Sequence, residues 1–260
     1  MIIEPSNLNF FFLTCSKNNH RKVHMLVEFK EFNLIEVESI NHDNKIKSTV
    51  IGFSKILDLA CKKQDINKPF TPFVILEDDV KKYRKFPVDI KIPDDTDILY
   101  IGLSSFGMTS NGNRDKEDSV CFRNVNNRIV KVFNMLSTHG LIVVSLRGLL
   151  TLQKCLFEDM FKNRAYDITL ASVQPFLNIY ALNVPLVYKY GQIEGEENQT
   201  KIKLKGLEEK KYNENLSNHD NLSVLSLHYQ EDVNINSKKN HKIIKEKVNK
   251  ENNKNQIIFK

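Results

Sequence analysis

The chain has 260 residues, of which 41% are hydrophobic, and a formal net charge of +6. This length can bury a full core, and it predicts one domain with additions or two small domains. The apolar runs are far shorter than the roughly 20 residues that cross a bilayer, and the first residues do not show the basic region, apolar segment and cleavage site that are typical of a signal peptide. We therefore expect a soluble, cytoplasmic protein without a transmembrane segment.

The basic excess lies at one end of the sequence. Residues 1–200 hold 25 basic and 24 acidic residues, a net charge of +1, whereas residues 201–260 hold 13 and 8, a net charge of +5. A nearly neutral body lacks the positive surface that phosphate backbones require. We expect no nucleic-acid binding by the folded part.

The four cysteines are spread evenly along the chain and form no C-x-x-C pair. This spacing is typical of reduced thiols in a cytosol-like compartment and not of zinc sites or a disulfide framework. The cysteines are Cys15, Cys61, Cys121 and Cys155.

The first third of the chain predicts a βαβ arrangement. Residues 8–14 are a short apolar run typical of a buried strand, residues 21–32 have helical spacing, and residues 32–40 predict a second strand. Ser48 is a suitable N-cap for an amphipathic helix that ends in two lysines. Pro69 and Pro72 then break the chain.

The middle and the last third continue the alternation of strands and helices. Residues 73–76 and 96–103 are apolar without alternation, which predicts strands covered on both faces, and a brief helix is possible between them. Residues 104–120 predict a mobile loop and a candidate lid. The remaining predicted elements are a hairpin or irregular β segment at 121–135, a strand at 138–146, a helix at 147–161, and a helix and short strand within 173–191.

These elements predict an α/β fold in which a mostly parallel central sheet is flanked by helices. From residue 206 onwards the composition changes to Lys, Asn, Glu and Ser, which is typical of an unfolded extension. We therefore expect one folded domain at 1–205 and a largely disordered extension at 206–260. One apolar island at 221–230 is a candidate for packing back as a helix or strand.

Three acids, Glu77, Asp78 and Asp79, directly follow the strand predicted at 73–76. In α/β sheets, ligands bind beyond the carboxyl ends of the strands. Adjacent carboxylates repel one another, and a divalent cation would relieve that repulsion. Hard oxygen ligands suit Mg²⁺ or Mn²⁺, which complete their shell with water and substrate phosphates. The alternative is a solvated turn whose acids cap the next segment.

With their neighbours, these residues resemble glycosyltransferase family 25, which has the GT-A fold and includes lipooligosaccharide (lipopolysaccharide-type) and collagen galactosyltransferases and enzymes of large DNA viruses. The resemblance covers about residues 8–200. It rests on the segments "NFFFLTCSKNNHRKVHML", "GFSKILDLA", "FVILEDDV", "TDILYIGL", "STHGLIVVSLRGLLTLQKCL" and "YDITLASVQPFLNIYALNVPLVYKYGQ". The sequence departs from the family pattern at Gly52 and Phe53, where a Ser-His pair is common, and at Gly140 and Leu141, where the family has Ala-Tyr.

The resemblance implies a metal-dependent hexosyltransferase of glycan biosynthesis that takes a nucleotide-diphosphate sugar, most simply a UDP-sugar, and a glycan or protein acceptor. If the chain is viral, its location would be the host cytoplasm. The DXD-like motif implies Asp79 as the principal ligand of Mn²⁺ or Mg²⁺. Glu77 and Asp78 would contact the metal, its waters or the ribose.

Two residues are candidates for catalysis. Asp167 is similar to the family's acid near the acceptor, where a carboxylate would take the proton of the attacking hydroxyl. Its structural alternative is the N-cap of the following helix. His139 would contact the acceptor or the sugar, although a single histidine at a strand edge also serves purely structural roles.

A further set of candidates would bind the cofactor. Thr14, Cys15 and Arg21 follow the first strand, near the expected nucleotide, although Arg21 also suits a solvated helix start. Lys201 and Lys203 would close over the diphosphate, and His228 would complete a metal shell. For these lysines the alternative is a solvated strand face or tail.

Two other functions remain open. The substitutions at Gly52 and Phe53 favour a catalytically inactive GT-A-like scaffold protein that binds partners through its basic tail. A metal-dependent phosphohydrolase could use the same acids, but such sites gather additional His and Asp residues that are absent here.

Overall fold

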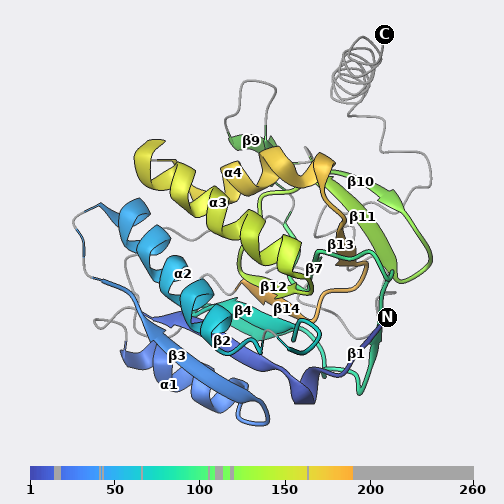
Figure 1. The fold of residues 1–260 in the computed structure, drawn as a ribbon, viewed down its shortest axis with the longest axis horizontal. Coiled ribbons are helices and arrows are strands. Elements are labelled where there is room, and N and C mark those ends of the chain that lie inside the picture. Colours follow the sequence, from blue (N-terminus) through green and yellow to red (C-terminus); the bar gives the residue numbers. More distant parts are fainter. Residues whose placement is uncertain are drawn as a thin grey trace, which may run out of the picture.

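The computed structural model describes residues 1–14, 19–40, 42, 44–65, 67–104, 106–108, 114–117, 120–162 and 164–189. The extension predicted from residue 206 and its apolar island lie outside these residues. Four α-helices and a large sheet form the described part (Figure 1). Within this part, no helix combines the length and the apolar character that membrane crossing requires. The predicted α/β class is confirmed.

The central sheet has eight strands in the order β10-β11-β13-β7-β12-β4-β2-β3. In chain order its strands are β2 (Asn9–Thr14), β3 (Asn33–Glu38), β4 (Phe73–Glu77), β7 (Ile98–Tyr100), β10 (Cys121–Asn124), β11 (Ile129–Asn134), β12 (Gly140–Val143) and β13 (Ile179–Leu182). Three two-stranded pairs surround it: β1 (Ile2–Ile3) with β6 (Ile90–Lys91), β5 (Val80–Lys82) with β14 (Val187–Lys189), and β8 (Phe106–Met108) with β9 (Arg114–Glu117).

The expectation of a mostly parallel sheet was wrong, because the strand pairing is mixed. β2 pairs in parallel with β3 and β4, and β13 with β7, but β12 lies antiparallel between β4 and β7, and β11 lies antiparallel between β13 and β10. A continuous apolar run indicates that a strand is covered on both faces of the sheet. The antiparallel strand β12 is covered in the same way as its neighbours. Its sequence therefore gives no sign of its direction.

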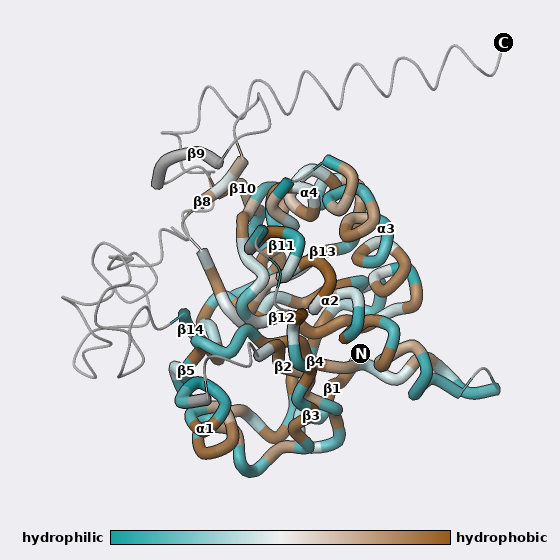
Figure 2. The backbone as a smooth tube through the Cα atoms, turned by 90° about the vertical axis from the view of Figure 1, so that its left-hand side faces the viewer, coloured by the Kyte–Doolittle hydropathy of each residue, from teal (hydrophilic) through white to brown (hydrophobic). Residues whose placement is uncertain are grey.

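Helices cover both faces of the sheet, and the side chains of each strand alternate between the two cores. On β4, Phe73 and Ile75 enter the core beneath α2 (Lys45–Lys62), α3 (Leu146–Lys162) and α4 (Tyr166–Val173). Val74 and Leu76 enter the opposite core, which α1 (Asn19–Glu28) covers. Figure 1 shows α2 and α3 lying side by side across one face of the sheet. In Figure 2 the central strands are mostly brown (hydrophobic), whereas the helices alternate between brown and teal stretches.

Several local predictions need correction. The N-cap of α2 is Asn44, whose Oδ1 accepts hydrogen bonds from the amides of Ile46 and Lys47 at 2.9 and 3.2 Å. Ser48 lies inside the helix, and its hydroxyl donates to the carbonyl of Ile40. The segment between β4 and β7 forms β5 and β6 and no helix.

Two further segments depart from the predicted pattern. Within 104–120, where we expected a loop, the described residues include the β8–β9 pair. The last helical segment begins earlier than expected, as α4, and continues as short 3-10 helix η2 (Gln174–Phe176); another 3-10 helix, η1 (Pro5–Asn7), precedes β2.

Candidate functional site

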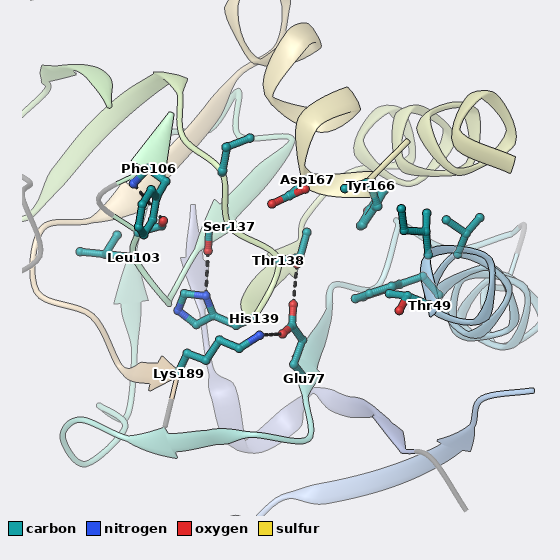
Figure 3. Close-up of a pocket in the computed structure, with 16 residues that line it drawn as sticks. Thr49, Glu77, Leu103, Phe106, Ser137, Thr138, His139, Tyr166, Asp167 and Lys189 are labelled. Atoms are coloured by element: carbon teal, nitrogen blue, oxygen red, sulfur yellow. Dashed lines mark hydrogen bonds and ion pairs between the residues drawn. The ribbon is translucent and has the colours of Figure 1, made fainter. Parts of the chain in front are cut away.

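A cavity of about 360 Å³ lies at the edge of the sheet where β4 and β7 end and β12 begins (Figure 3). This volume is within the range of small-molecule sites in proteins. It is also the edge at which α/β sheets usually bind ligands. The lining residues are Ile46, Thr49, Val50, Phe53, Glu77, Leu103, Ser104, Phe106, Leu136, Ser137, Thr138, His139, Ala165, Tyr166, Asp167 and Lys189.

The three adjacent acids do not point to the same side of the sheet. Glu77 is the last residue of β4 and shares the face of Phe73 and Ile75, so it lines the cavity beside α2 and α4. Asp78 is the next residue and lies on the side of α1, where the Arg21 guanidinium contacts it at 2.9 Å. The alternation of a strand therefore separates neighbouring carboxylates.

Lys189 on β14 joins the two parts of the acidic motif. Its ammonium lies 2.6 Å from Glu77 Oε2 and 3.4 Å from Asp79 Oδ2. Arg21 lies 3.7 Å from Asp79 as well as 2.9 Å from Asp78. In the described part of the chain, two side-chain cations thus offset much of the repulsion among the three acids.

Glu77 is the best-compensated of these acids. Burial would raise the pKa of Glu77, but the charge of Lys189, together with hydrogen bonds from Lys189 and Thr138, lowers it to about 2. Thr138 Oγ1 donates to Glu77 Oε1 at 2.5 Å, so each carboxylate oxygen has a partner, and Figure 3 shows both contacts. The charge of Glu77 also raises the pKa of Lys189. Glu77 is a fixed negative charge at neutral pH.

Asp78 and Asp79 are less well compensated than Glu77. Burial raises the pKa of Asp78 despite the charge of Arg21. Burial, together with the negative charges of Glu77 and Asp78, raises the pKa of Asp79 to about 6 although Lys189 and Arg21 oppose the shift. Asp79 Oδ1 is buried and accepts no hydrogen bond. Asp79 therefore has a negative charge that is only partly compensated and an oxygen without a hydrogen-bond partner. A further cation would satisfy both.

These residues fit a cation held by one principal carboxylate. No group of three or more His, Cys, Asp or Glu side chains that could hold a metal gathers among the described residues. Mg²⁺ commonly takes one or two carboxylates and fills its other positions with water and phosphate oxygens. Asp79 could supply such a contact, whereas both oxygens of Glu77 are already bound to protein donors.

His139 is a buried, neutral member of the site. Its Nδ1 lies 3.1 Å from Ser137 Oγ, and its Nε2 has no hydrogen-bond partner. Burial lowers the pKa of His139 to about 4, although the nearby Glu77 acts in the opposite direction. The ring packs against Gly102 so closely that a Cβ there would lie 2.4 Å from Nε2. The neutral ring can donate or accept a hydrogen bond, but it has no positive charge with which to attract a ligand.

Asp167 lines the cavity from the first turn of α4, where its carboxylate is directed toward the side on which Ser137 and Thr138 lie (Figure 3). The N-cap alternative for Asp167 was wrong, because the N-cap is Ala165. Asp167 Oδ1 instead accepts from the amide of Ile168 at 3.0 Å.

Phe53 and Tyr166 form part of the apolar wall beside Asp167. Their ring centroids are 5.0 Å apart, and the Tyr166 hydroxyl is buried without a partner. Phe53 occupies one of the two positions where the resembled family often has a Ser-His pair. The cavity wall is therefore apolar at a position where a Ser-His pair would make it polar.

The remaining sequence candidates lie outside this arrangement. Thr14 ends β2, which pairs directly with β4, and its hydroxyl donates to Glu36 Oε1 at 3.0 Å. Cys15, Lys201, Lys203 and His228 lie outside the described residues. The other three cysteines, Cys61, Cys121 and Cys155, are free thiols.

Sequence reasoning missed Lys189 as a site residue. It is 112 positions from Glu77, and a single lysine after a strand carries no local signal of an ion pair. The available hint was the unbalanced charge of three acids at a strand end, which requires cations from elsewhere in the fold.

The chain was compared with protein-family models, with curated proteins and with solved structures. No protein-family model and no curated protein matches it. Eleven chains of solved structures match, and one of them, described as the crystal structure of A197 from STIV, is 12% identical and covers 69% of this chain and 83% of its own length. Its TM-score is 0.37. At this level of similarity the comparison carries no functional argument, and the site is interpreted from its own geometry.

Proposed function

We propose that the protein is a glycosyltransferase of GT-A-like architecture that transfers a sugar from a nucleotide-diphosphate donor to a hydroxyl group of a glycan or protein. One observation carries this proposal: Glu77, His139 and Asp167, three candidates chosen from sequence, line one cavity together with Lys189 at the strand ends. These residues come from four separate parts of the chain. A cavity with carboxylates and a cation suits a reaction between a polyol and a phosphate ester.

The donor diphosphate would bind on the side of Asp79, where cations are already present. Arg21 and Lys189 supply positive charge within ion-pair distance of Asp79, and such side chains stabilise phosphate oxygens. A Mn²⁺ or Mg²⁺ held by Asp79 would neutralise the charge that develops on the leaving nucleotide diphosphate. A UDP-sugar is the simplest donor of this kind.

Asp167 would accept the proton of the attacking hydroxyl. The acceptor oxygen forms a bond to the anomeric carbon as its proton passes to the Asp167 carboxylate. The bond between that carbon and the phosphate oxygen breaks, and its electron pair leaves with the nucleotide diphosphate. His139, a neutral ring that lines the cavity, would contact a sugar hydroxyl.

A second candidate function is a catalytically inactive scaffold with the same fold. It is favoured by Phe53, because the cavity wall is apolar at a position that is often polar in the resembled family. A scaffold of this kind would keep its fold but would bind neither UDP nor Mn²⁺.

Isotope-labelled UDP-sugars with Mn²⁺ test the proposal. Wild type should release UDP and transfer or hydrolyse at least one sugar, whereas Asp79→Asn should lose about 100-fold or more of that turnover, as expected when a group stabilising transition-state charge is removed. Asp65→Asn is a matched control, because Asp65 is an exposed acid paired only with nearby residues. Equal turnover by wild type and Asp79→Asn would contradict the metal role.

Binding measurements with the same proteins separate the two candidate functions. Calorimetry with UDP and Mn²⁺ should give a saturable signal for wild type and for Asp65→Asn. A folded wild-type protein that binds neither and turns over no donor would favour the scaffold.

A further inference from the structure

The two sides of β4 divide the acidic motif into parts with different surroundings. Glu77 faces the cavity together with Thr138 and Asp167, whereas Asp78 is held on the side of α1 by Arg21. Asp79, the acid with an unused buried oxygen, is absent from the cavity lining. Lys189 contacts both parts, since its ammonium lies near Glu77 and near Asp79.

We propose that Glu77 belongs to the acceptor site and not to the metal site: it binds a hydroxyl group of the sugar ring that enters the cavity. This inference rests on the proposed function and adds to it the role of the first acid and the chemical class of the acceptor. The part of the acceptor that enters the cavity is a polyhydroxylated ring with one apolar face. The diphosphate and its cation remain with Asp79 on the other side of Lys189.

The polar side of the cavity suits a hydroxyl donor. Thr138 and Lys189 each occupy one oxygen of Glu77, and every carboxylate oxygen can accept a second hydrogen bond. The two contacts fix the carboxylate before a ligand arrives, which reduces the entropy lost on binding. Glu77 is also more exposed than the other acids, with 21% of its side chain accessible against 12% for Asp78 and 11% for Asp79.

Glu77 would position the hydroxyl and would not remove its proton. Both Glu77 oxygens already accept hydrogen bonds, one from Thr138 and one from Lys189, which hold the carboxylate in place. Asp167 enters the same cavity from α4 and remains the proton acceptor of the proposed reaction. The two carboxylates thus have separate tasks on one substrate.

The apolar side chains that line the cavity suit the less polar face of a sugar ring. They include Val50 and Phe53 of α2, Leu103 after β7, and Leu136 before β12. His139 and Tyr166 also line this cavity. Pockets that combine apolar walls with a few oriented polar groups are typical of small-molecule sites.

Two binding assays on each variant test this division. The first titrates Mn²⁺ together with UDP, followed by the loss of the free Mn²⁺ signal in electron paramagnetic resonance. The second measures a set of methyl hexosides by saturation-transfer NMR. Glu77→Gln should keep the Mn²⁺–UDP affinity within about threefold of wild type and lose about tenfold or more in hexoside affinity, as expected for a hydrogen bond to a charged group. Asp79→Asn should show the reverse pattern.

Thr138→Val is a second, independent variant. It removes the hydrogen bond that orients Glu77 while it leaves all three acids in place. It should weaken hexoside binding and leave Mn²⁺–UDP binding unchanged. Thermal unfolding of each variant establishes that it is folded before its affinity is compared.

Three results would overturn the inference while the proposed function stands: Glu77→Gln weakening Mn²⁺–UDP binding as much as Asp79→Asn, hexoside binding that is insensitive to Glu77→Gln, or no saturable hexoside binding by a wild type that binds Mn²⁺–UDP. A folded wild type that binds neither Mn²⁺ nor UDP would instead refute the proposed function.

Discussion

Lys189 at the end of β14 contacts Glu77 at the end of β4 at 2.6 Å and reaches Asp79 at 3.4 Å, so one lysine holds two carboxylates that are separated by a single residue. Most of the Asp79 side chain and about two thirds of that of Lys189 are buried. Removing Lys189 would take away the ion-pair partner of Glu77 and one of the two cations near Asp79. The free energy of unfolding should therefore depend on Lys189.

We expect Lys189→Met to lower the free energy of unfolding by about 1–3 kcal/mol, less than for a fully buried pair because Lys189 is partly exposed. Lys162→Met is the matched control, since Lys162 pairs with Glu158 on an exposed helix face, and it should cost less than about 0.5 kcal/mol. Urea unfolding at pH 7 measures both values. Equal losses in the two variants would contradict the role given to Lys189.

The effect of Lys189→Met should also depend on pH. The folded-state pKa of Glu77 is lowered from 4.5 to about 2, so the ion pair contributes its full stability above pH 4.5 and loses it as the pH falls toward 2. The difference between wild type and Lys189→Met should therefore shrink across that range. A difference that stays constant down to pH 2.5 would show that Glu77 is not the partner that matters.

Gly102 and His139 should be energetically coupled. A Cβ at Gly102 would lie 2.4 Å from His139 Nε2, and overpacking of this kind costs about 1–3 kcal/mol. We expect Gly102→Ala to be destabilising in wild type and nearly neutral when His139 is already Ala. A double-mutant cycle by chemical denaturation measures the coupling, and additive effects would mean that the ring does not occupy the space beside Gly102.

Tyr166 and Tyr100 are a matched pair of buried tyrosines with opposite predictions. The Tyr166 hydroxyl has no partner, whereas the Tyr100 hydroxyl accepts a hydrogen bond from Gln174 Nε2 at 3.0 Å. Tyr166→Phe should leave stability unchanged or raise it by up to about 1 kcal/mol, and Tyr100→Phe should lower it by about 1 kcal/mol. Thermal and urea unfolding give the order of the two variants. A larger loss for Tyr166→Phe would reveal a protein partner for its hydroxyl.

Asp159 makes stability fall as the pH rises. Its side chain is fully buried, Thr169 donates to it, and its other oxygen has no partner. Burial raises its pKa from 3.8 to about 6, so the folded state holds a proton in that range that the unfolded state has lost. Asp159→Asn should gain about 2–3 kcal/mol relative to wild type between pH 4 and pH 6. A constant difference over this range would contradict the shift.

Much of the fold follows from local patterns in the sequence. The runs predicted as covered strands at 73–76 and within 96–103 do form the buried strands β4 and β7 at the centre of the sheet. The direction of β12 could not be predicted, because a strand between two covered faces has the same composition in either orientation. The start of α2 was misplaced since Ser48 and Asn44 are both good capping residues, and the choice depends on packing.

The acidic motif was located correctly at a strand end, but the arrangement of its side chains was not predicted. Treating Glu77, Asp78 and Asp79 as one cluster neglected the alternation of the strand, which directs Glu77 and Asp78 to opposite faces. That rule is available from sequence and would have separated them. The identity of the compensating cation, Lys189, depends on the pairing of β14 with β5 and is not a local property.

A crystal structure of the protein grown with Mn²⁺ and UDP tests the central claim most directly. The account predicts a manganese ion bound to Asp79 and to the diphosphate, with Glu77 still held by Thr138 on the cavity side. A well-ordered structure in which UDP and manganese are absent from this edge, or in which Asp79 contacts no ion, would contradict it.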